Sequence, residues 1–269
     1  MKALKCFKPM NKRIVYIGAE RVGLVCLQKL MDLGKNVVAV LTADDSLEYK
    51  IADFVSFDEN VEKIPLYKVV NTKDPETMLL IKNLKPDLII VISWSQIIPK
   101  EILDYAPLGC IGIHYSLLPE RRGGAPLNWA IIDGLRKSGI TLFFYNEGVD
   151  TGDIIAQKEF EITDIDTPRE LLDKICILAP EIIEENINSI ENGTVLRIKQ
   201  DERMATYTKS RKPEDGLIDW NKQIDEIYNF IRAIAPPYPC AFTFLGDKKM
   251  AISKVTRKDN KLYIEGVIE

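Results

Sequence analysis

The chain has 269 residues, of which 46% are hydrophobic and 28% charged, so it can bury a core and is not expected to be disordered. Its 36 Lys and Arg residues against 40 Asp and Glu give a formal charge of −4, which argues against a nucleic acid partner because proteins that hold polyanions usually carry a basic stripe. Five scattered cysteines without a C-x-x-C pair indicate reduced thiols in a cytoplasmic protein, and no apolar run is long enough to span a membrane.

The first part of the chain alternates between predicted strands and predicted helices. Strands are predicted at 13–17, 37–42, 65–70 and 87–93, and helices at 22–33 and 74–84. This alternation predicts a parallel sheet with right-handed crossovers. The last of these strands is apolar throughout, which is typical of a central strand covered on both faces.

The second part continues the pattern and then changes character. A strand at 109–114 leads into a loop at 115–126, a helix at 127–133, strands at 139–145 and 153–162, and a long helix at 167–192. After about residue 200, one amphipathic helix at 224–235 precedes short alternating segments at 241–245, 250–254 and 261–264. We therefore predict an α/β fold with a Rossmann-like, mostly parallel sheet over residues 11–200, helices on both faces, and a small, partly β C-terminal subdomain over 201–269 that resembles an incomplete barrel.

Two polar residues stand out at the ends of these strands. His114 is the only histidine and ends a predicted strand, and ligands of open α/β sheets bind beyond the carboxyl ends of strands. Its imidazole suits general acid/base chemistry, although a structural histidine is an equal alternative. Asp150 begins an Asp-Thr-Gly-Asp cluster, which taken alone predicts a turn. If this turn folds back over His114, the carboxylate could orient or protonate the imidazole.

Other site chemistries find less support in the sequence. A metal centre is not expected, because no second histidine exists and the cysteines lack ligand spacing. The chain has no G-x-S-x-G elbow of a serine hydrolase. Gly18 and Gly23 follow the first strand, but Glu20 stands where a dinucleotide-binding loop needs a glycine and brings the wrong charge. We interpret both glycines as turn and packing residues.

Two longer motifs carry a family resemblance. The segment from Ile113 through H-Y-S-L-L-P-E-R-R-G-G-A to Pro126, and the segment from Gly148 through V-D-T-G-D-I to Ile155, match in order and spacing the formyltetrahydrofolate-dependent formyltransferases. The resemblance extends to the end of the chain. It implies an enzyme that moves a formyl group from 10-formyltetrahydrofolate to a primary amine, with no metal.

The resemblance also implies a catalytic triad of the form Asn-x-His…Asp. His114 and Asp150 match it, but Gly112 stands at the position of the asparagine, whose amide is understood to bind the formyl oxygen. Losing one such donor typically costs about 2.7–4 kcal/mol of transition-state stabilisation. A water beside Gly112, a backbone N–H or protonated His114 could substitute, and Gly112→Asn would then raise activity. A silent descendant that binds its ligands without turnover remains an alternative.

The family pattern assigns binding residues as well. It implies folate binding by two segments, Trp94, Ser95, Gln96, Ile97 and Ile98 together with Gly148 and Val149. It implies substrate binding by residues of the loop and the following helix, namely Ser116, Arg121, Arg122, Gly123, Pro126 and Asn128. For the two arginines, bidentate contact with a nucleotide diphosphate and solvated loop charge are equal alternatives.

Within the family, the acceptor is the open point. The run Pro126-Leu-Asn-Trp129 is similar to enzymes that formylate nucleotide-linked amino sugars, and the acidic charge and a tail that ends at Glu269 favour the same acceptor. Methionyl-tRNA is the alternative acceptor. A nicotinamide-dependent oxidoreductase is disfavoured by Glu20, and the sequence leaves a homodimer open.

Overall fold

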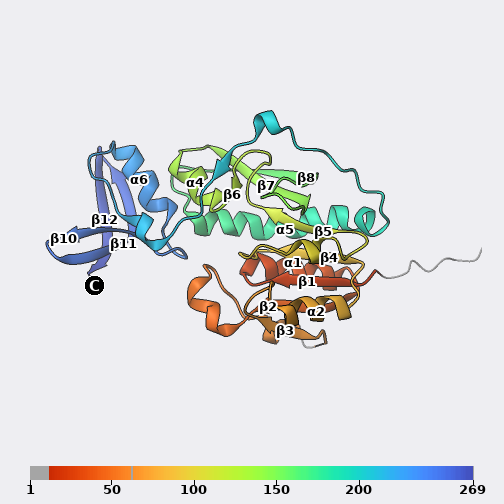
Figure 1. Ribbon diagram of the computed structural model, residues 1–269. Helices are drawn as coiled ribbons and strands as arrows, with labels where there is room; N and C mark the ends of the chain where they lie inside the picture. Colours follow the sequence, from red (N-terminus) through yellow and green to blue (C-terminus); the bar gives the residue numbers. More distant parts are fainter. Residues whose placement is uncertain (1–11, 62, 269) are drawn as a thin grey trace, which may run out of the picture.

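The computed structural model describes residues 12–61 and 63–268, so residues 11 and 62 of the predicted catalytic domain and residue 269 of the predicted C-terminal subdomain lie outside the described residues. A seven-stranded sheet runs through the larger part of the molecule in the order β3-β2-β1-β4-β5-β7-β8 (Figure 1). Neighbouring strands pair in parallel except where β7 meets β5 and β8. The bounds are β1 Ile14–Gly18, β2 Val37–Ala43, β3 Leu66–Val69, β4 Leu88–Ile92, β5 Cys110–His114, β7 Lys137–Phe144 and β8 Ile154–Glu161.

Helices cover both faces of this sheet. Because successive strand side chains alternate between faces, β1 sends Tyr16 to one core and Val15 to the other. The first core is completed by α1 (Arg21–Asp32) and α5 (Pro168–Glu191), and the second by α2 (Pro75–Asn83) and α3 (Lys100–Leu103). The predicted α/β fold class is therefore confirmed.

A smaller unit follows at the C-terminus. Helix α6 (Ile224–Ala233) packs on a three-stranded antiparallel sheet of β10 (Ala241–Leu245), β11 (Lys248–Lys258) and β12 (Lys261–Ile268). The other side of α6 contacts α4 (Pro126–Ile132), and Asn128 Nδ2 donates to the Ala233 carbonyl at 2.7 Å. A division at residue 200 stays a prediction. No helix within the described residues has the length and apolarity needed to cross a bilayer.

Several short elements were not predicted. Helix α3 has four residues, and short 3₁₀ helices form at η1 (Asp45–Lys50), η2 (Asp58–Asn60), η3 (Glu202–Met204) and η4 (Pro213–Gly216). The predicted loop at 115–126 contains β6 (Arg122–Gly123), which pairs with β9 (Tyr207–Thr208). The last two strands are longer than expected because Asp259 and Asn260, with φ of 50° and 55°, close a tight hairpin between them.

Candidate active site

His114 and Asp150 lie together, as the sequence allowed. His114 ends β5, and the β7–β8 connection folds back over the sheet so that Asp150 Oδ2 lies 3.5 Å from His114 Nδ1. The second ring nitrogen, Nε2, is 2.8 Å from the Arg121 carbonyl oxygen. A carbonyl oxygen only accepts hydrogen bonds, so Nε2 carries a proton and Nδ1 is the nitrogen that faces the carboxylate.

The position of Asp150 is fixed from two sides. Its Oδ2 accepts the Gly123 N–H at 2.7 Å, and its backbone adopts a left-handed φ of 53°. Gln200 Nε2 donates to the carbonyl oxygens of Asp150 and Gly152 at 2.8 and 2.7 Å, which holds this turn in place. Asp150 is thus oriented toward His114 by residues that are 27 and 50 positions away in sequence.

The two loop arginines have partners within the chain. Arg122 is fully buried, and its guanidinium donates to Glu202, Tyr207 and Gln200 at 2.7–3.0 Å. The interpretation of Arg122 as solvated loop charge is therefore wrong, and its donors are already engaged. Arg121 pairs with Asp133 at 2.8 Å, and its carbonyl rather than its guanidinium contacts His114.

Three other predicted substrate residues shape the same loop. Ser116 is buried, and its hydroxyl donates to the Glu120 carbonyl at 2.6 Å. Gly123 has a φ of 97° and holds Asp150, and Pro126 begins α4. These residues form and hold the loop, and contact with a substrate stays a prediction for each of them.

Gly112 has a neighbour that the sequence did not reveal. It lies two residues before His114 on the same face of β5. A Cβ atom added at Gly112 would lie 2.6 Å from the Val91 carbonyl oxygen and 2.7 Å from the Tyr145 hydroxyl oxygen. The space beside Gly112, where a water was one of the three possible substitutes for the asparagine, is therefore filled by the side chain of Tyr145.

The predicted folate-binding residues lie in different surroundings, some in the core, some exposed and some lining cavities. Ile98 is in the core, whereas Ile97 and Val149 are 69% and 56% exposed. Gln96 is held by Thr72 and by the Val70 carbonyl, and the buried Nε1 of Trp94 has no hydrogen-bond partner among the described residues. Gly148 lines a cavity of about 340 Å³ together with Tyr145, Asn146 and Leu103. Ser95 lines a different, larger cavity.

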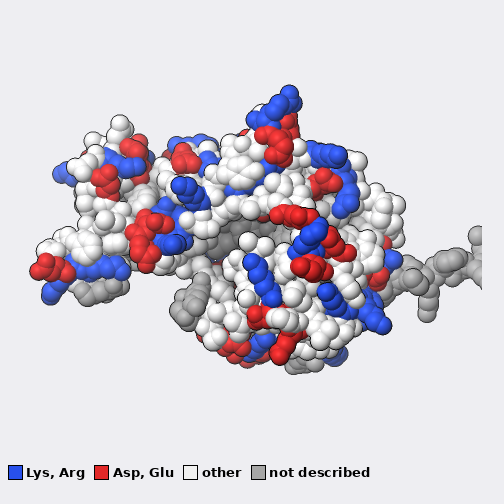
Figure 2. Space-filling view, viewed as in Figure 1, with Lys and Arg blue, Asp and Glu red and all other residues white. Residues whose placement is uncertain are grey.

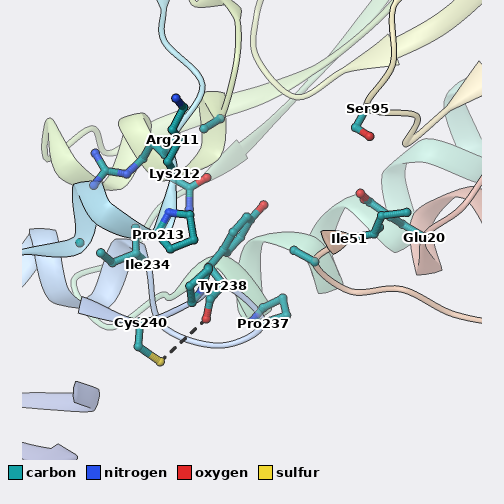
Figure 3. Close-up of a pocket in the computed structure, with 15 residues that line it drawn as sticks. Glu20, Ile51, Ser95, Arg211, Lys212, Pro213, Ile234, Pro237, Tyr238 and Cys240 are labelled. Carbon is teal, nitrogen blue, oxygen red and sulfur yellow. Dashed lines mark hydrogen bonds between the residues drawn. The ribbon is translucent and has the colours of Figure 1, made fainter. Parts of the chain in front are cut away.

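This larger cavity, the α6 cavity, lies between the strand ends and the C-terminal unit and measures about 580 Å³. Figure 3 shows Tyr238 projecting between Glu20, Ile51 and Ser95 on one side and Arg211 and Lys212 on the other. Asn128 also lines it, and the buried Oδ1 of Asn128 has no hydrogen-bond partner among the described residues. In Figure 2 the surface is hollowed near its middle, and acidic and basic side chains are interspersed around the hollow.

Glu20 behaves differently from the expectation based on its charge. Burial, followed by the nearby Asp53 carboxylate, raises the pKa of Glu20 to about 8, so the carboxyl is mostly neutral at pH 7. The argument that a negative charge excludes a phosphate there therefore does not hold. The packing interpretation of the glycines does hold, because a Cβ at Gly18 or Gly23 would lie 2.8 or 3.2 Å from the Ile92 carbonyl oxygen. Across the residues that the structure describes, no cluster of His, Cys, Asp and Glu could hold a metal.

Sequence reasoning missed Tyr145 and Gln200. Tyr145 closes a predicted strand, but only the antiparallel pairing of β7 with β5 brings its hydroxyl to Gly112. Gln200 follows the long helix in a segment without a recognisable motif, and its contacts with the Asp150 turn appear only in the folded chain.

Comparisons with known proteins agree on the family. A formyl transferase model matches residues 13–187, and a model of the formyl transferase C-terminal domain matches residues 211–266. Methionyl-tRNA formyltransferases of Ruminiclostridium cellulolyticum and Alkaliphilus oremlandii are 36% and 37% identical over 90% and 93% of this chain and 78% and 82% of theirs.

Two solved formyltransferase structures have a fold similar to that of this chain. Methionyl-tRNA formyltransferase from Clostridium thermocellum superposes with a TM-score of 0.67 at 25% identity, over 96% of this chain and 99% of that one. A 4-N formyltransferase from Francisella tularensis gives a TM-score of 0.71 at 21% identity, over 95% and 97% of the two chains, and at this identity the likeness shows the fold alone.

Proposed function

The chain belongs to the formyl transferase family and catalyses folate-dependent formyl transfer to an amine, and we propose that this amine is the α-amino group of methionyl-tRNA. The observation that carries the proposal is the identity of 36–37% to methionyl-tRNA formyltransferases over at least 90% of the chain. This likeness outweighs the net charge of −4, because net charge does not report where individual Lys and Arg residues lie.

The geometry around His114 supports amine chemistry. In our proposal the acceptor amine attacks the formyl carbon beside His114, and Asp150 takes the proton that the amine loses. Asp150 is suited to this role because its Oδ2 is bound by Gly123 while its Oδ1 has no hydrogen-bond partner within residues 12–61 and 63–268. A proton that reaches His114 Nδ1 would be stabilised by the same carboxylate, 3.5 Å away.

The residues near this pair fit a folate. The co-substrate 10-formyltetrahydrofolate supplies the formyl carbon and a planar ring system rich in donors and acceptors. The cavity lined by Tyr145, Asn146 and Gly148 adjoins Gly112 through the Tyr145 side chain. We propose that this cavity and the Trp94 indole, whose buried N–H lacks a partner among the described residues, hold the folate.

A nucleotide-linked amino sugar is the second candidate acceptor. The α6 cavity places the unpaired Oδ1 of Asn128 together with the cationic Arg211 and Lys212. Sugar hydroxyls or an amine would donate to Asn128, and a diphosphate would suit the two cations. A cavity of about 580 Å³ is in the size range of small-molecule sites.

A direct turnover assay separates the two acceptors. Protein and 10-formyltetrahydrofolate are incubated with methionyl-tRNA or with a panel of 3-amino and 4-amino nucleotide sugars, and products are analysed by mass spectrometry for the gain of one formyl group. We expect formyl-methionyl-tRNA, with a KM that rises steeply with salt because phosphate contacts release counterions.

Each outcome decides between the proposals. Formylation of a nucleotide sugar, with methionyl-tRNA unchanged under the same conditions, replaces the proposed acceptor by the second candidate. No formylation of either class, with folate binding demonstrated by calorimetry, rejects both acceptors.

A further inference from the structure

The side chain that lies beside Gly112 belongs to Tyr145. Gly112 and His114 share one face of β5, and two residues of a strand span about 6–7 Å. The Tyr145 hydroxyl oxygen and Cε1 both lie 2.7 Å from the point that a Cβ of Gly112 would occupy. The absence of a side chain at Gly112 is therefore what allows the tyrosine ring to reach this face of the strand next to His114.

Tyr145 is held firmly in this place. Its backbone N–H donates to the Cys110 carbonyl at 2.8 Å, which continues the pairing of β7 with β5. Its ring packs against Phe143 with centroids 5.0 Å apart, and Phe143 in turn meets the His114 ring edge-on at 6.5 Å. The hydroxyl is thus positioned by packing and by the strand ladder, and no bond of its own is needed to hold it.

The hydroxyl itself is a free donor. Tyr16, Tyr105 and Tyr115 each use their hydroxyls in hydrogen bonds, to the Gly23 carbonyl, to the Lys82 carbonyl and with Ser93. The Tyr145 hydroxyl makes no hydrogen bond to any residue that the structure describes. Burial, then the neighbouring Cys110 and Asp150, raises the pKa of Tyr145 above its ordinary value, so the phenol keeps its proton throughout the neutral range.

Formyl transfer needs such a donor. When the amine nitrogen forms its bond to the formyl carbon, the C=O electron pair moves onto the formyl oxygen, and this negative charge must be stabilised. His114 already directs Nε2 at the Arg121 carbonyl and Nδ1 at Asp150. Around Gly112, the hydroxyl of Tyr145 is a donor that remains open toward a ligand.

We propose that Tyr145 is a catalytic residue whose hydroxyl donates a hydrogen bond to the formyl oxygen of the bound folate, and this proposal rests on the folate-dependent formyl transfer described above. In the full step the amine proton passes to Asp150. The C=O bond then re-forms, the bond between the formyl carbon and N10 breaks, and N10 takes the proton as tetrahydrofolate leaves.

Measurements of ligand binding test the role of Tyr145 without an acceptor. Dissociation constants for 10-formyltetrahydrofolate and tetrahydrofolate are measured by anaerobic calorimetry for wild type, Tyr145→Phe and the control Tyr105→Phe. We expect Tyr145→Phe to weaken binding of the formylated ligand about fivefold and to leave tetrahydrofolate binding unchanged. The control variant, which loses a hydroxyl bonded to Lys82, should bind both ligands like wild type.

Turnover with any accepted amine provides the second measurement. Tyr145→Phe should lower kcat by about 100-fold, the usual effect of losing one oxyanion donor, while unfolding in urea stays like wild type. Equal weakening of both folates, or no weakening of either, overturns the role of Tyr145. If methionyl-tRNA is not formylated but the folate selectivity is lost in Tyr145→Phe, the acceptor proposal fails and the role of Tyr145 stands.

Discussion

The formyl centre (Gly112, His114, Tyr145 and Asp150) and the α6 cavity differ in how their polar atoms are used. In the formyl centre both nitrogens of His114 face fixed partners, Gly123 and Gln200 hold Asp150 in place, and ring packing and the strand ladder fix Tyr145, although its hydroxyl has no hydrogen-bond partner among the described residues. In the α6 cavity, the Asn128 Oδ1 has no hydrogen-bond partner among the described residues, and the Glu20 carboxyl has a pKa raised to about 8.

We interpret this difference as one between catalysis in the formyl centre and ligand binding in the α6 cavity. Groups that stabilise a transition state gain from being fixed before the substrate arrives, since no reorganisation is then needed during the reaction. Buried polar atoms without partners are costly until a ligand satisfies them, so they favour binding of a ligand with complementary groups. We therefore expect changes in the formyl centre to act mainly on turnover, with Tyr145→Phe also weakening binding of the formylated folate, and changes in the α6 cavity to alter ligand affinity and pH dependence.

The largest effect is expected for His114→Ala. Removing the imidazole should lower kcat about 1,000-fold, within the usual range for losing a group that takes part in proton transfer, because His114 Nδ1 can then no longer share a proton with Asp150. The affinity for tetrahydrofolate should change little. Single-turnover kinetics and calorimetry measure the two quantities. His114→Gln keeps a polar side chain of similar size and should be equally inactive. A wild-type rate in either variant would show that the reacting centre lies elsewhere.

A smaller effect, on stability, is expected for Gly112→Asn. A Cβ at this position would lie 2.6 Å from the Val91 carbonyl oxygen, which is backbone and cannot move aside cheaply. We expect a loss of about 1–3 kcal/mol in the free energy of unfolding in urea and a lower kcat, because Tyr145 must also move.

The control is Gly193→Asn, at a helix end where φ is 67° and no atom lies within 4 Å of an added Cβ. Asparagine tolerates this left-handed position, so stability should change by only a few tenths of a kcal/mol. A rise in formylation for Gly112→Asn above the wild-type rate would contradict both the crowding at Gly112 and the role of Tyr145.

The residues of the formyl centre also illustrate which features could be predicted from the sequence and which could not. The strands and long helices followed from apolar periodicity, and the motif around His114 placed it at the end of β5 beside the turn of Asp150. The expectation that Gly112→Asn raises activity stays untested, and it did not take Tyr145 into account, because the contact of Tyr145 with Gly112 depends on the pairing of β7 with β5.

The binding residues were harder to predict than the catalytic ones. A sequence does not show whether an arginine in a glycine-rich loop faces solvent or another segment. Arg122 is fully buried because Gln200 and Glu202, about 80 positions later, receive its guanidinium. Such contacts between distant segments have no local pattern in the sequence, whereas an apolar strand that ends in a family motif does.

The smallest effect is expected for Glu20→Gln, and it depends on pH. The folded pKa of Glu20, about 8, is above its ordinary value of 4.5, so the native state binds the proton more tightly than the unfolded chain. The contribution of this group to stability is therefore greatest below about pH 4.5 and is lost as pH rises to about 8. Glutamine, which stays neutral, removes this loss.

Urea unfolding of wild type and Glu20→Gln at several pH values measures the difference. The shift would correspond to about 5 kcal/mol for a fully buried group, but Glu20 keeps part of its surface exposed, so we expect the variant to gain roughly 2 kcal/mol relative to wild type between about pH 5 and pH 9. Parallel pH profiles of the unfolding free energy would show that the carboxyl is ionised in the native protein.

If the acceptor occupies the α6 cavity, ionisation of Glu20 above about pH 8 should raise the KM for the acceptor in wild type but not in Glu20→Gln. An equal pH dependence of KM in the two proteins would place the acceptor away from Glu20.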